Sequence, residues 1–336
     1  MRIALTGASG HIGVNLCRLL LERGHQLRVL IHRNTVGLEN LPLSRVQGDL
    51  RDARSLDELV AGAEAVIHLA AVISIRGRKT RDLFTHNVEG TRRIVEAARR
   101  GSIRRFIHFS SIHALQHRPY DRVLDESRPL ALDDPMPYSR SKALAEAVVQ
   151  RAVEEGLDAV ILNPTAVIGP NDYAPSLLGR ALILLAQGRL PALVPGGYDW
   201  VDARDVAAAA EAAVERGRSG ERYILSGRWS DLRELAEMTA RVNGRPPRKF
   251  VCPYGLARLG VPFLNLYCAL RSKIPLYTRD SLSTLHVGHR RISCDKAVRE
   301  LGFSPRPLPE TVRDTLDWFR TNGFIGGPED RRRDID

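Results

Sequence analysis

Tyr138 and Lys142 stand four residues apart in a stretch that is expected to be helical. On a helix this spacing places both side chains on one face, within reach of each other. An ammonium group beside a phenol stabilises the phenolate and lowers the pKa of tyrosine from about 10 toward the range of a general acid or base. Only 5 of the 50 basic residues are lysines, so chance seldom supplies such a pair in this composition. The two residues are therefore a candidate site for proton transfer.

Two serines, Ser110 and Ser111, follow the apolar run from Arg105 to Phe109, which has the length and composition of a buried strand. Ligands of open α/β sheets bind at the carboxyl ends of the strands, where a hydroxyl can bind a carbonyl oxygen. A serine pair at this position is otherwise a turn or a helix cap. Neither serine lies in a GxSxG nucleophile motif, so their meaning depends on Tyr138.

A glycine-rich turn, Thr6 to Gly13 (TGASGHIG), follows the first apolar run and precedes a helical pattern. Glycines between a strand and a helix let the backbone approach a pyrophosphate at the helix N-terminus. The spacing is GxxGxxG, which departs from the common GxGxxG fingerprint. The strand and helix on either side favour a dinucleotide site over a turn that serves only packing.

The second apolar run ends at His32 and Arg33, where a dinucleotide site would read the 2′ position of the ribose. An acidic side chain there binds the hydroxyl of NAD, whereas an arginine accepts the phosphate of NADP. No Asp or Glu occurs between Arg23 and Leu38, so the sequence favours NADP(H), with NAD(H) as the alternative cofactor. Arg33 is otherwise a solvated loop arginine in an arginine-rich chain.

Short apolar runs alternate with amphipathic helical stretches through the first half of the chain, which is typical of an α/β fold with a doubly wound parallel sheet. We expect strands at Ile3 to Leu5, Leu27 to Ile31, Arg45 to Gln47, Ala65 to Leu69, Arg105 to Phe109 and Ala159 to Leu162. The clearest expected helices are Ile12 to Glu22, Ser55 to Val60, Asn87 to Arg100 and Tyr138 to Glu155.

Proline and glycine become frequent after Pro164, which marks a second, smaller and mostly helical domain. We expect a Rossmann-type domain over residues 1–168, with returning segments near 193–225, and a substrate domain over 169–320. Helices are expected at Leu177 to Ala186, Asp202 to Arg216, Leu232 to Val242 and Pro309 to Phe319, with a strand at Arg222 to Leu225. The polar tail 326–336 is expected to be disordered.

The chain has 336 residues, of which 43% are hydrophobic and 26% charged, as in ordinary globular proteins. Its four cysteines (Cys17, Cys252, Cys268 and Cys294) form no close pair, which argues against a disulfide framework or a metal knuckle and favours a cytoplasmic location. No signal peptide is expected before the first strand, and no apolar stretch reaches the roughly 20 residues of a spanning helix. His286 and His289 form an isolated HxxH, so we expect no metal.

Residues 245–299 hold eleven basic and two acidic residues, a large share of the net charge of +11. Apolar residues at partly helical spacing accompany them: Leu256, Leu259, Val261, Phe263, Leu264, Leu266, Tyr267 and Leu270. The segment could rest on anionic lipid, but a core-facing helix with a solvated basic rim explains the pattern better. Basic and aromatic residues are not interleaved as in nucleic-acid binding, so no nucleic-acid partner is expected.

Seven motifs in order resemble those of extended short-chain dehydrogenases/reductases, the NAD(P)-dependent epimerase/dehydratase family. They are TGASGHIG from Thr6, GDLRD from Gly48, HLAA from His68, NVEGT from Asn87, FSS from Phe109, YSRSK from Tyr138 and NPTAVIGP from Asn163. The resemblance covers the chain to about Phe319 and implies a Rossmann-type fold.

The resemblance also assigns roles to individual residues. Ser111 and Tyr138 would flank the substrate oxygen, Lys142 would bind the nicotinamide ribose, Asp49 would contact adenine, and Asn87 would support the catalytic set. The implied cofactor-binding residues are Gly7, Ser9, Gly10, His11, Ile12, Gly13, His32, Arg33, Asp49, Leu50, Leu69, Ala70, Ala71, Asn87, Tyr138, Lys142, Pro164, Thr165 and Val167. Candidate substrate-binding residues are His113, Tyr173 and Trp200.

Ser111 is followed by Ile112 and His113 rather than the VYG of many sugar-nucleotide epimerases, and the acid pair of the dehydratases is missing. The chain more closely resembles the dihydroflavonol reductase and 3β-hydroxysteroid dehydrogenase branch. This favours reduction of a ketone or aldehyde of a small, lipophilic substrate. Nucleotide-sugar epimerisation or dehydration and a non-catalytic dinucleotide sensor are the alternatives, and a homodimer is compatible with the sequence.

Overall fold

The computed structural model describes residues 1–73, 80–190, 192–244, 250–270 and 277–326. The chain forms two compact units, each made of three stretches. The first unit comprises Met1–Thr165, Ala203–Ser226 and Arg291–Pro305, and the second comprises Ala166–Asp202, Gly227–Arg290 and Arg306–Asp336. The tail that was expected to be disordered lies almost wholly outside the described residues.

A seven-stranded sheet in the order β3-β2-β1-β4-β5-β6-β9 forms the centre of the first unit, and all its strands are parallel. The strands are β1 (Arg2–Thr6), β2 (Gln26–Ile31), β3 (Ser44–Gln47), β4 (Ala65–His68), β5 (Arg105–Phe109), β6 (Ala159–Pro164) and β9 (Arg222–Leu225). The inner strands are buried along nearly their whole length, as expected of a sheet covered on both faces. The α/β class and the parallel sheet are therefore confirmed.

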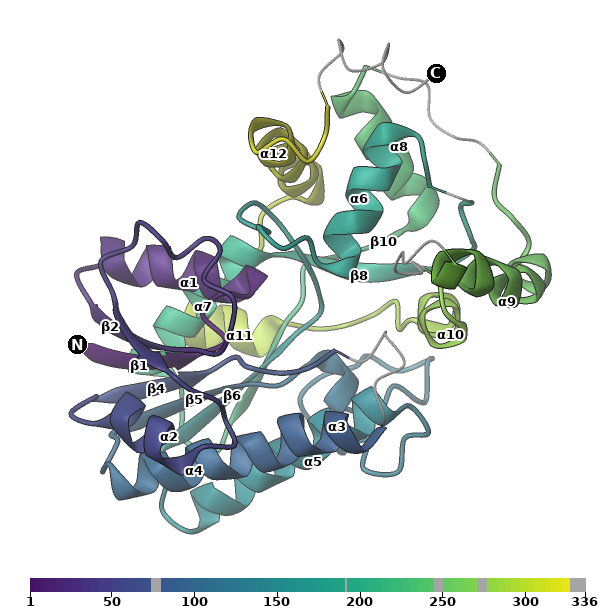
Figure 1. The fold of residues 1–336 in the computed structure, drawn as a ribbon. Helices are drawn as coiled ribbons and strands as arrows, with labels where there is room; N and C mark the ends of the chain where they lie inside the picture. Colours follow the sequence, from purple (N-terminus) through teal and green to yellow (C-terminus); the bar gives the residue numbers. More distant parts are fainter. Residues whose placement is uncertain (74–79, 191, 245–249, 271–276, 327–336) are drawn as a thin grey trace. The chain divides into compact units, whose positions relative to one another are not determined.

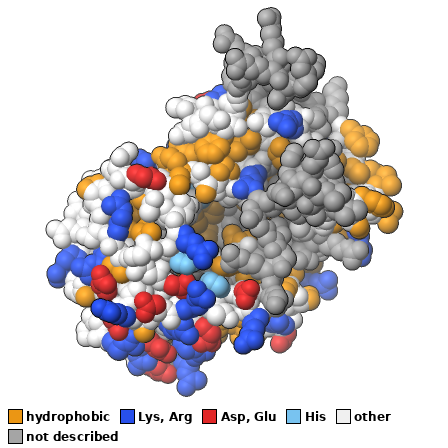
Figure 2. All heavy atoms as spheres, viewed as in Figure 1, with side chains coloured by type: hydrophobic (Ala, Val, Ile, Leu, Met, Phe, Trp, Pro, Cys, Tyr) orange, Lys and Arg blue, Asp and Glu red, His pale blue; other side chains and the backbone are white. Residues whose placement is uncertain are grey.

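Helices cover both faces of this sheet (Figure 1). On one face lie α2 (Ala53–Val60), α4 (Gly90–Arg100) and α5 (Pro137–Glu154), and on the other lie α1 (His11–Glu22), α7 (Ala203–Arg216) and α11 (Asp295–Leu301). The short helix α3 (Thr80–Phe84), the π-helical turn η1 (Thr85–Glu89) and the 3₁₀ turn η2 (Ile112–Ala114) complete the unit. Figure 2 shows basic and acidic side chains interspersed over the visible face of this unit.

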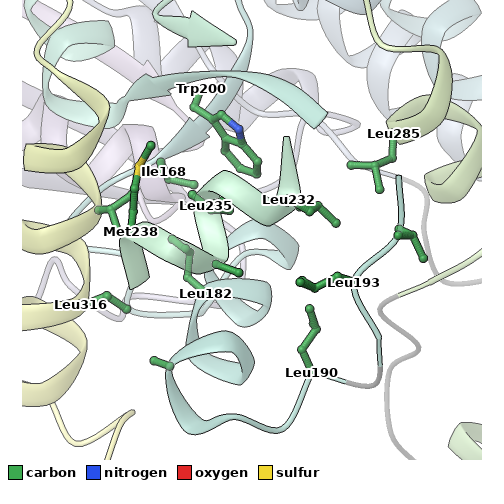
Figure 3. Packing of buried hydrophobic residues seen from close by; sticks show 14 of the residues in the cluster. Ile168, Leu182, Leu190, Leu193, Trp200, Leu232, Leu235, Met238, Leu285 and Leu316 are labelled. Atoms are coloured by element: carbon green, nitrogen blue, oxygen red, sulfur yellow. The ribbon is translucent and has the colours of Figure 1, made fainter. Parts of the chain in front are cut away.

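The second unit contains a smaller sheet in the order β10-β8-β7. Its elements are β7 (Ala166–Ile168), α6 (Leu177–Gln187), β8 (Gly197–Asp202), β10 (Arg228–Asp231), α8 (Leu232–Val242), α9 (Tyr254–Leu270), α10 (Arg279–Val287) and α12 (Leu308–Thr321). Buried side chains from the sheet and from helices α6, α8 and α12, including Ile168, Leu182, Leu235 and Leu316, form its core (Figure 3).

Three features of this architecture differ from the sequence-based expectations. β9 and α7 return to the first unit, but residues 193–202 do not, and a further segment, Arg291–Pro305, does. The three-stranded sheet was missed because its strands are short and one of them, Arg228–Asp231, is mostly polar. The helix expected from Asn87 instead begins with the π-helical turn η1, and α4 starts at Gly90.

Candidate active site

Most of the predicted site residues lie just beyond the carboxyl ends of the strands of the first unit. The glycine turn follows β1, His32 and Arg33 follow β2, and Asp49 follows β3. Leu69 to Ala71 follow β4 and Ser110 and Ser111 follow β5. Because all seven strands are parallel, these segments share one edge of the sheet, and the chain reverses its direction of winding between β1 and β4. Such a switch point is where ligands bind in doubly wound sheets.

Two glycines of the turn, Gly7 and Gly13, leave no room for a side chain. Gly7 has a φ of +76°, and a Cβ atom there would lie 2.6 Å from the backbone nitrogen of Ala70. A Cβ at Gly13 would lie 2.2 Å from the carbonyl oxygen of Gly7. Gly10 caps α1 without a side-chain hydrogen bond, and the first turn of this helix carries no acidic residue. The turn therefore fits a pyrophosphate at the α1 N-terminus.

Buried hydrogen bonds connect the strand before this turn to Asn87. The His68 ring contacts Thr6 Oγ1 through Nδ1 at 2.6 Å and Thr91 Oγ1 through Nε2 at 3.0 Å. Thr91 donates its single hydroxyl proton to the Asn87 carbonyl oxygen at 2.6 Å, so His68 Nε2 donates and Nδ1 accepts. Burial lowers the pKa of His68 to about 3, in agreement with this neutral form.

The Asn87 side chain is buried and fully engaged. Its Oδ1 accepts a hydrogen bond from the Val72 nitrogen at 2.7 Å, and its Nδ2 donates to the Val72 carbonyl and to Ser141 Oγ, each at 3.0 Å. Ser141 Oγ in turn donates to the Tyr138 carbonyl at 2.8 Å. Asn87 therefore fixes the loop after β4 against the N-terminal turn of α5, and its part in catalysis stays a prediction.

Ser111, Tyr138 and His113 lie together. Ser111 lies close enough to Tyr138 to lower the pKa of its phenol in part, and the Ser111 Oγ accepts a hydrogen bond from the His113 nitrogen at 3.2 Å. The His113 ring meets the Tyr138 ring edge-on at 6.1 Å and stacks on His117 at 5.3 Å. Burial lowers the pKa of His113 to about 3, so this ring is neutral. The structure thus brings the predicted serine, tyrosine and one predicted substrate residue to one place.

Lys142 is 3% exposed and its Nζ donates to the Phe109 carbonyl oxygen at 2.6 Å. Burial lowers the pKa of Lys142 to about 8, while the Glu146 carboxylate raises it in part. The pKa of Tyr138 is raised by burial and lowered in part by its bond with Ser111. The net pKa shift of Tyr138 is therefore upward, and a lowering contribution from Lys142 stays a prediction. The cause of the upward shift is desolvation of the phenol, which burial imposes regardless of the helical spacing.

At the end of β2, Arg33 is exposed, and no ion pair to it is present within the described residues. His32 Nε2 lies 3.2 Å from Asp49 Oδ2, and Arg51 Nη2 lies 2.9 Å from the same oxygen. The hydrogen bond from Arg51 is the main cause that lowers the pKa of Asp49 to about 2. No acidic residue lies near Arg33 in the sequence. In the structure, however, Asp49 lies beside the neighbouring His32, because β3 pairs with β2.

The other predicted cofactor residues are spread over the two units. Leu50 packs against Gly90, where a Cβ would lie 2.9 Å from its Cδ1. Pro164 ends β6, and Thr165 bonds to the Leu225 carbonyl through its nitrogen at 3.1 Å. Val167 belongs to β7 of the second unit and pairs with Val201. Ser9, His11 and Ile12 lie in the turn and at the start of α1.

Two predicted substrate residues belong to the second unit. Trp200 is 2% exposed and its indole nitrogen donates to the Ser230 carbonyl at 3.0 Å. Its place in the core (Figure 3) gives it a packing role instead of the expected substrate contact, since both its ring and its polar atom are already engaged. Tyr173 is half-buried, with its ring 4.9 Å from that of Trp318.

The pair His286 and His289 also lies in the second unit. His286 stacks on Tyr254 at 4.2 Å, and His289 is buried. Within the part of the chain that the structure describes, no group of three or more His, Cys, Asp or Glu residues is arranged to hold a metal ion.

Helix α9 presents two apolar faces. Val261 is buried in the core cluster, with Tyr254 and Ala257 packed against it, but Leu256, Leu259 and Phe263 are 61%, 70% and 76% exposed. Hydrophobic side chains gather at this helix in Figure 2. The expected core-facing helix with a solvated basic rim is thus only half right, because exposed apolar side chains occupy part of its outer face. The side chains of Leu266, Tyr267 and Leu270 lie outside the part of the structure that is described. Among the described residues, no helix is long and apolar enough to cross a membrane.

Sequence reasoning missed a buried polar cluster beneath the serine. Glu146 lies one helical turn beyond Lys142, and Asn163 at the end of β6 contacts both Glu146 and the Ser111 backbone. Arg222 of β9 completes the cluster. The four-residue spacing of Glu146 from Lys142 could have indicated their proximity from the sequence. The position of Arg222 gave no such indication, because it lies on a strand distant in sequence.

Comparison with known proteins agrees with this geometry. Residues 3–226 match the model of the NAD dependent epimerase/dehydratase family. The chain is similar to sterol demethylase protein B of Methylococcus capsulatus, with 36% identity over 97% of this chain and all of the relative. It is also similar to a 2-alkyl-3-oxoalkanoate reductase of Stenotrophomonas maltophilia, with 31% identity over 91% of this chain and 95% of the relative. The crystal structure of gox2253 superposes with a TM-score of 0.83 and 31% identity, covering 97% and 99% of the two chains.

This chain belongs to the NAD-dependent epimerase/dehydratase family of extended short-chain dehydrogenases/reductases. The resemblance found in its motifs is confirmed. It is an NAD(P)-dependent enzyme whose chemistry falls within oxidoreduction, epimerisation or dehydration.

Proposed function

We propose that this enzyme uses NADPH to reduce the ketone or aldehyde group of a lipophilic small molecule, and in reverse oxidises a secondary alcohol. The observation that carries the proposal is the position of Ser111 at the carboxyl end of β5, close enough to Tyr138 to lower the pKa of its phenol in part. Two hydroxyl groups held together at this edge can both contact one substrate oxygen.

The residues of the first unit divide the work of such a reaction. Nicotinamide, when bound, supplies the hydride that the carbonyl carbon accepts. Tyr138 gives its proton to the substrate oxygen, and its raised pKa keeps it protonated at neutral pH. Ser111 donates a hydrogen bond that polarises the carbonyl. Lys142 supplies a positive charge below its pKa of about 8 and holds the nicotinamide ribose.

The preference for NADPH is supported by Arg33, which is exposed and available at the end of β2. Arg51 adds a second guanidinium group, although Asp49 binds it at 2.9 Å. A doubly charged phosphate would compete with the Asp49 carboxylate for Arg51, so Arg33 carries most of the discrimination. NAD(H) remains the alternative cofactor.

The printed names of two relatives support a lipophilic carbonyl substrate, since one refers to a sterol and the other to the reduction of an oxoalkanoate. The alternative is nucleotide-sugar epimerisation, which the family description includes. The segment after Ser111 bears on this choice, because η2 places His113 beside Tyr138 in place of the VYG segment of many epimerases.

Cofactor stoichiometry tests the proposal. The chain is incubated with NADPH and a panel of polycyclic ketones, 3-oxo acids and nucleotide sugars, and absorbance of NADPH and products are followed together. One NADPH consumed per alcohol formed supports reduction. Formation of an epimer from a nucleotide sugar without net change in the cofactor would overturn the proposal.

A further inference from the structure

A carboxylate with no exposed surface, Glu146, lies within the first unit on helix α5. Its Oε1 is 2.9 Å from Arg222 Nε, and its Oε2 accepts a hydrogen bond from Asn163 Nδ2 at 2.9 Å. Glu146, Arg222 and Asn163 belong to α5, β9 and β6. Their contacts therefore connect one helix to two neighbouring strands.

The same amide group of Asn163 also donates to the carbonyl oxygen of Ser111 at 3.0 Å. Both hydrogens of Asn163 Nδ2 are thereby used, one on Glu146 and one on the serine peptide. The orientation of Asn163 consequently depends on Glu146, and the position of the Ser111 peptide depends on Asn163.

Glu146 also acts on Lys142, which precedes it by one helical turn. Burial withdraws Lys142 from water, and the Glu146 carboxylate is the group that favours its charged form. His68 of β4 and His108 of β5 feel the charge of Lys142, but burial lowers the pKa of both rings, so they add no charge near neutral pH. Tyr138, on the same helix, is neutral as well.

Stability alone does not explain a buried pair at this place. Removing two charges from water costs several kcal/mol per ion, and apolar residues of similar volume often fold as well or better. Part of the free-energy cost of burying Arg222 is offset by the hydrogen bond that it donates to the Arg128 carbonyl oxygen at 3.1 Å. The two carboxylate oxygens of Glu146, in contrast, contact Arg222 and Asn163, and Asn163 in turn binds the Ser111 carbonyl.

We propose that Glu146 is a positioning residue of the active site, which holds the Ser111 peptide through Asn163 and places its negative charge one helical turn from Lys142. The inference deepens the proposed function and rests on it for the consequence in turnover. Its effect on Lys142 can be measured without substrate or cofactor.

The test is a titration of Lys142 by NMR in the full ligand-free chain. The sequence contains only 5 lysines, so selective ¹³Cε labelling gives few signals, and Lys142→Arg identifies the one required. The wild-type signal should titrate near pH 8. In Glu146→Gln its midpoint should fall by on the order of one pH unit, because an opposite charge nearby is lost.

Two further variants separate positioning from folding. Glu146→Gln combined with Arg222→Gln removes both charges, so it should unfold at a higher temperature than Glu146→Gln and still show the lowered Lys142 midpoint. Glu300→Gln breaks the Arg218–Glu300 pair of the same unit, which lies 2.6 Å apart, and should leave the midpoint unchanged. If Glu146→Gln does not fold, the double variant supplies the same titration.

Activity assays complete the test. With a reducible substrate, kcat of Glu146→Gln should fall roughly tenfold or more, and its activity should be lost at lower pH than in the wild type. A wild-type Lys142 midpoint in folded Glu146→Gln or in the double variant would overturn the inference even if the wild type reduces ketones. Absence of NADPH-dependent reduction in the wild type, with the midpoint lowered as expected, would overturn only the proposed function.

Discussion

The β5–α5 region buries the charged side chain of Lys142, whereas charged side chains at the β2–β3 edge of the same sheet are exposed to water. Lys142 is 3% exposed, and burial displaces its pKa to about 8. At the β2–β3 edge the side chains of His32 and Arg51 are 52% and 56% exposed, and they form an ion-pair cluster around Asp49. Water and salt screen exposed pairs far more than buried ones. We therefore expect the first region to govern the rate and its pH dependence, and the second to govern the choice of cofactor.

Replacement of Tyr138 by Phe should produce the largest effect. Loss of the proton donor should lower kcat by about 10² to 10⁴, with little change in the Kd of NADPH, because the hydroxyl acts on the substrate. Steady-state kinetics and cofactor titration measure both. Tyr223→Phe, which removes another hydroxyl of the first unit, is the matched control. Wild-type turnover in Tyr138→Phe would refute the assigned role.

The pH profile is expected to report Lys142. A lysine with a pKa of about 8 is charged below that pH and loses its proton above it, so activity should fall as pH rises through about 8. In Lys142→Arg the side chain stays charged, so this alkaline limb should move to higher pH although the maximal rate falls. Lys296→Arg provides the control. An alkaline limb that stays at the same pH in Lys142→Arg would assign it to another group.

At the exposed edge, Arg33→Ala should raise the Kd of NADPH by about tenfold, which corresponds to one charge-assisted hydrogen bond to the 2′-phosphate. NADH binding should not change. The difference between the two cofactors should shrink at high salt, in contrast to the effects at Lys142. Arg92→Ala removes an equal charge from α4 as a control. Equal affinity of the wild type for both cofactors would contradict the preference.

The smallest effect is expected for Asp49→Asn. Asp49 has a pKa of about 2 and is ionised at every working pH, so the variant removes one negative charge and frees Arg51. NADPH should bind up to about threefold more tightly, with the same factor from pH 6 to pH 9. Isothermal titration can resolve this change. Weaker binding of NADPH would show instead that the Asp49 carboxylate binds the adenine or keeps Arg51 in place.

Sequence reasoning succeeded where one local segment determines the outcome. The six strands expected in the first half were found with small changes at their ends, since buried parallel strands consist of continuous apolar runs. The positions of Ser111 after β5 and of Tyr138 and Lys142 on α5 were also found as expected, since one strand end and one helical turn determine them. The polar strand Arg228–Asp231 carries no such signal, and its pairing with β8 decides its structure.

The remaining features depend on packing between distant segments. The raised pKa of Tyr138 results from desolvation by neighbours that no spacing rule identifies. Asp49 reaches His32 because β3 pairs with β2, and Arg222 reaches Glu146 because β9 pairs with β6. Local sequence could name these residues, but only the assembled sheet shows which charges meet.

The division of the first unit into three stretches of chain has a consequence for biosynthesis. A ribosome completes β1 to β6 by Pro164, but it has not yet made Arg222, nor α7 and α11, which cover one face of the sheet (Figure 1). Until those segments emerge, Glu146 lacks its charge partner and the apolar surface under α7 faces solvent or a chaperone. A nascent chain can thus form its glycine turn early, whereas the Glu146–Arg222 pair can form only after Arg222 has emerged.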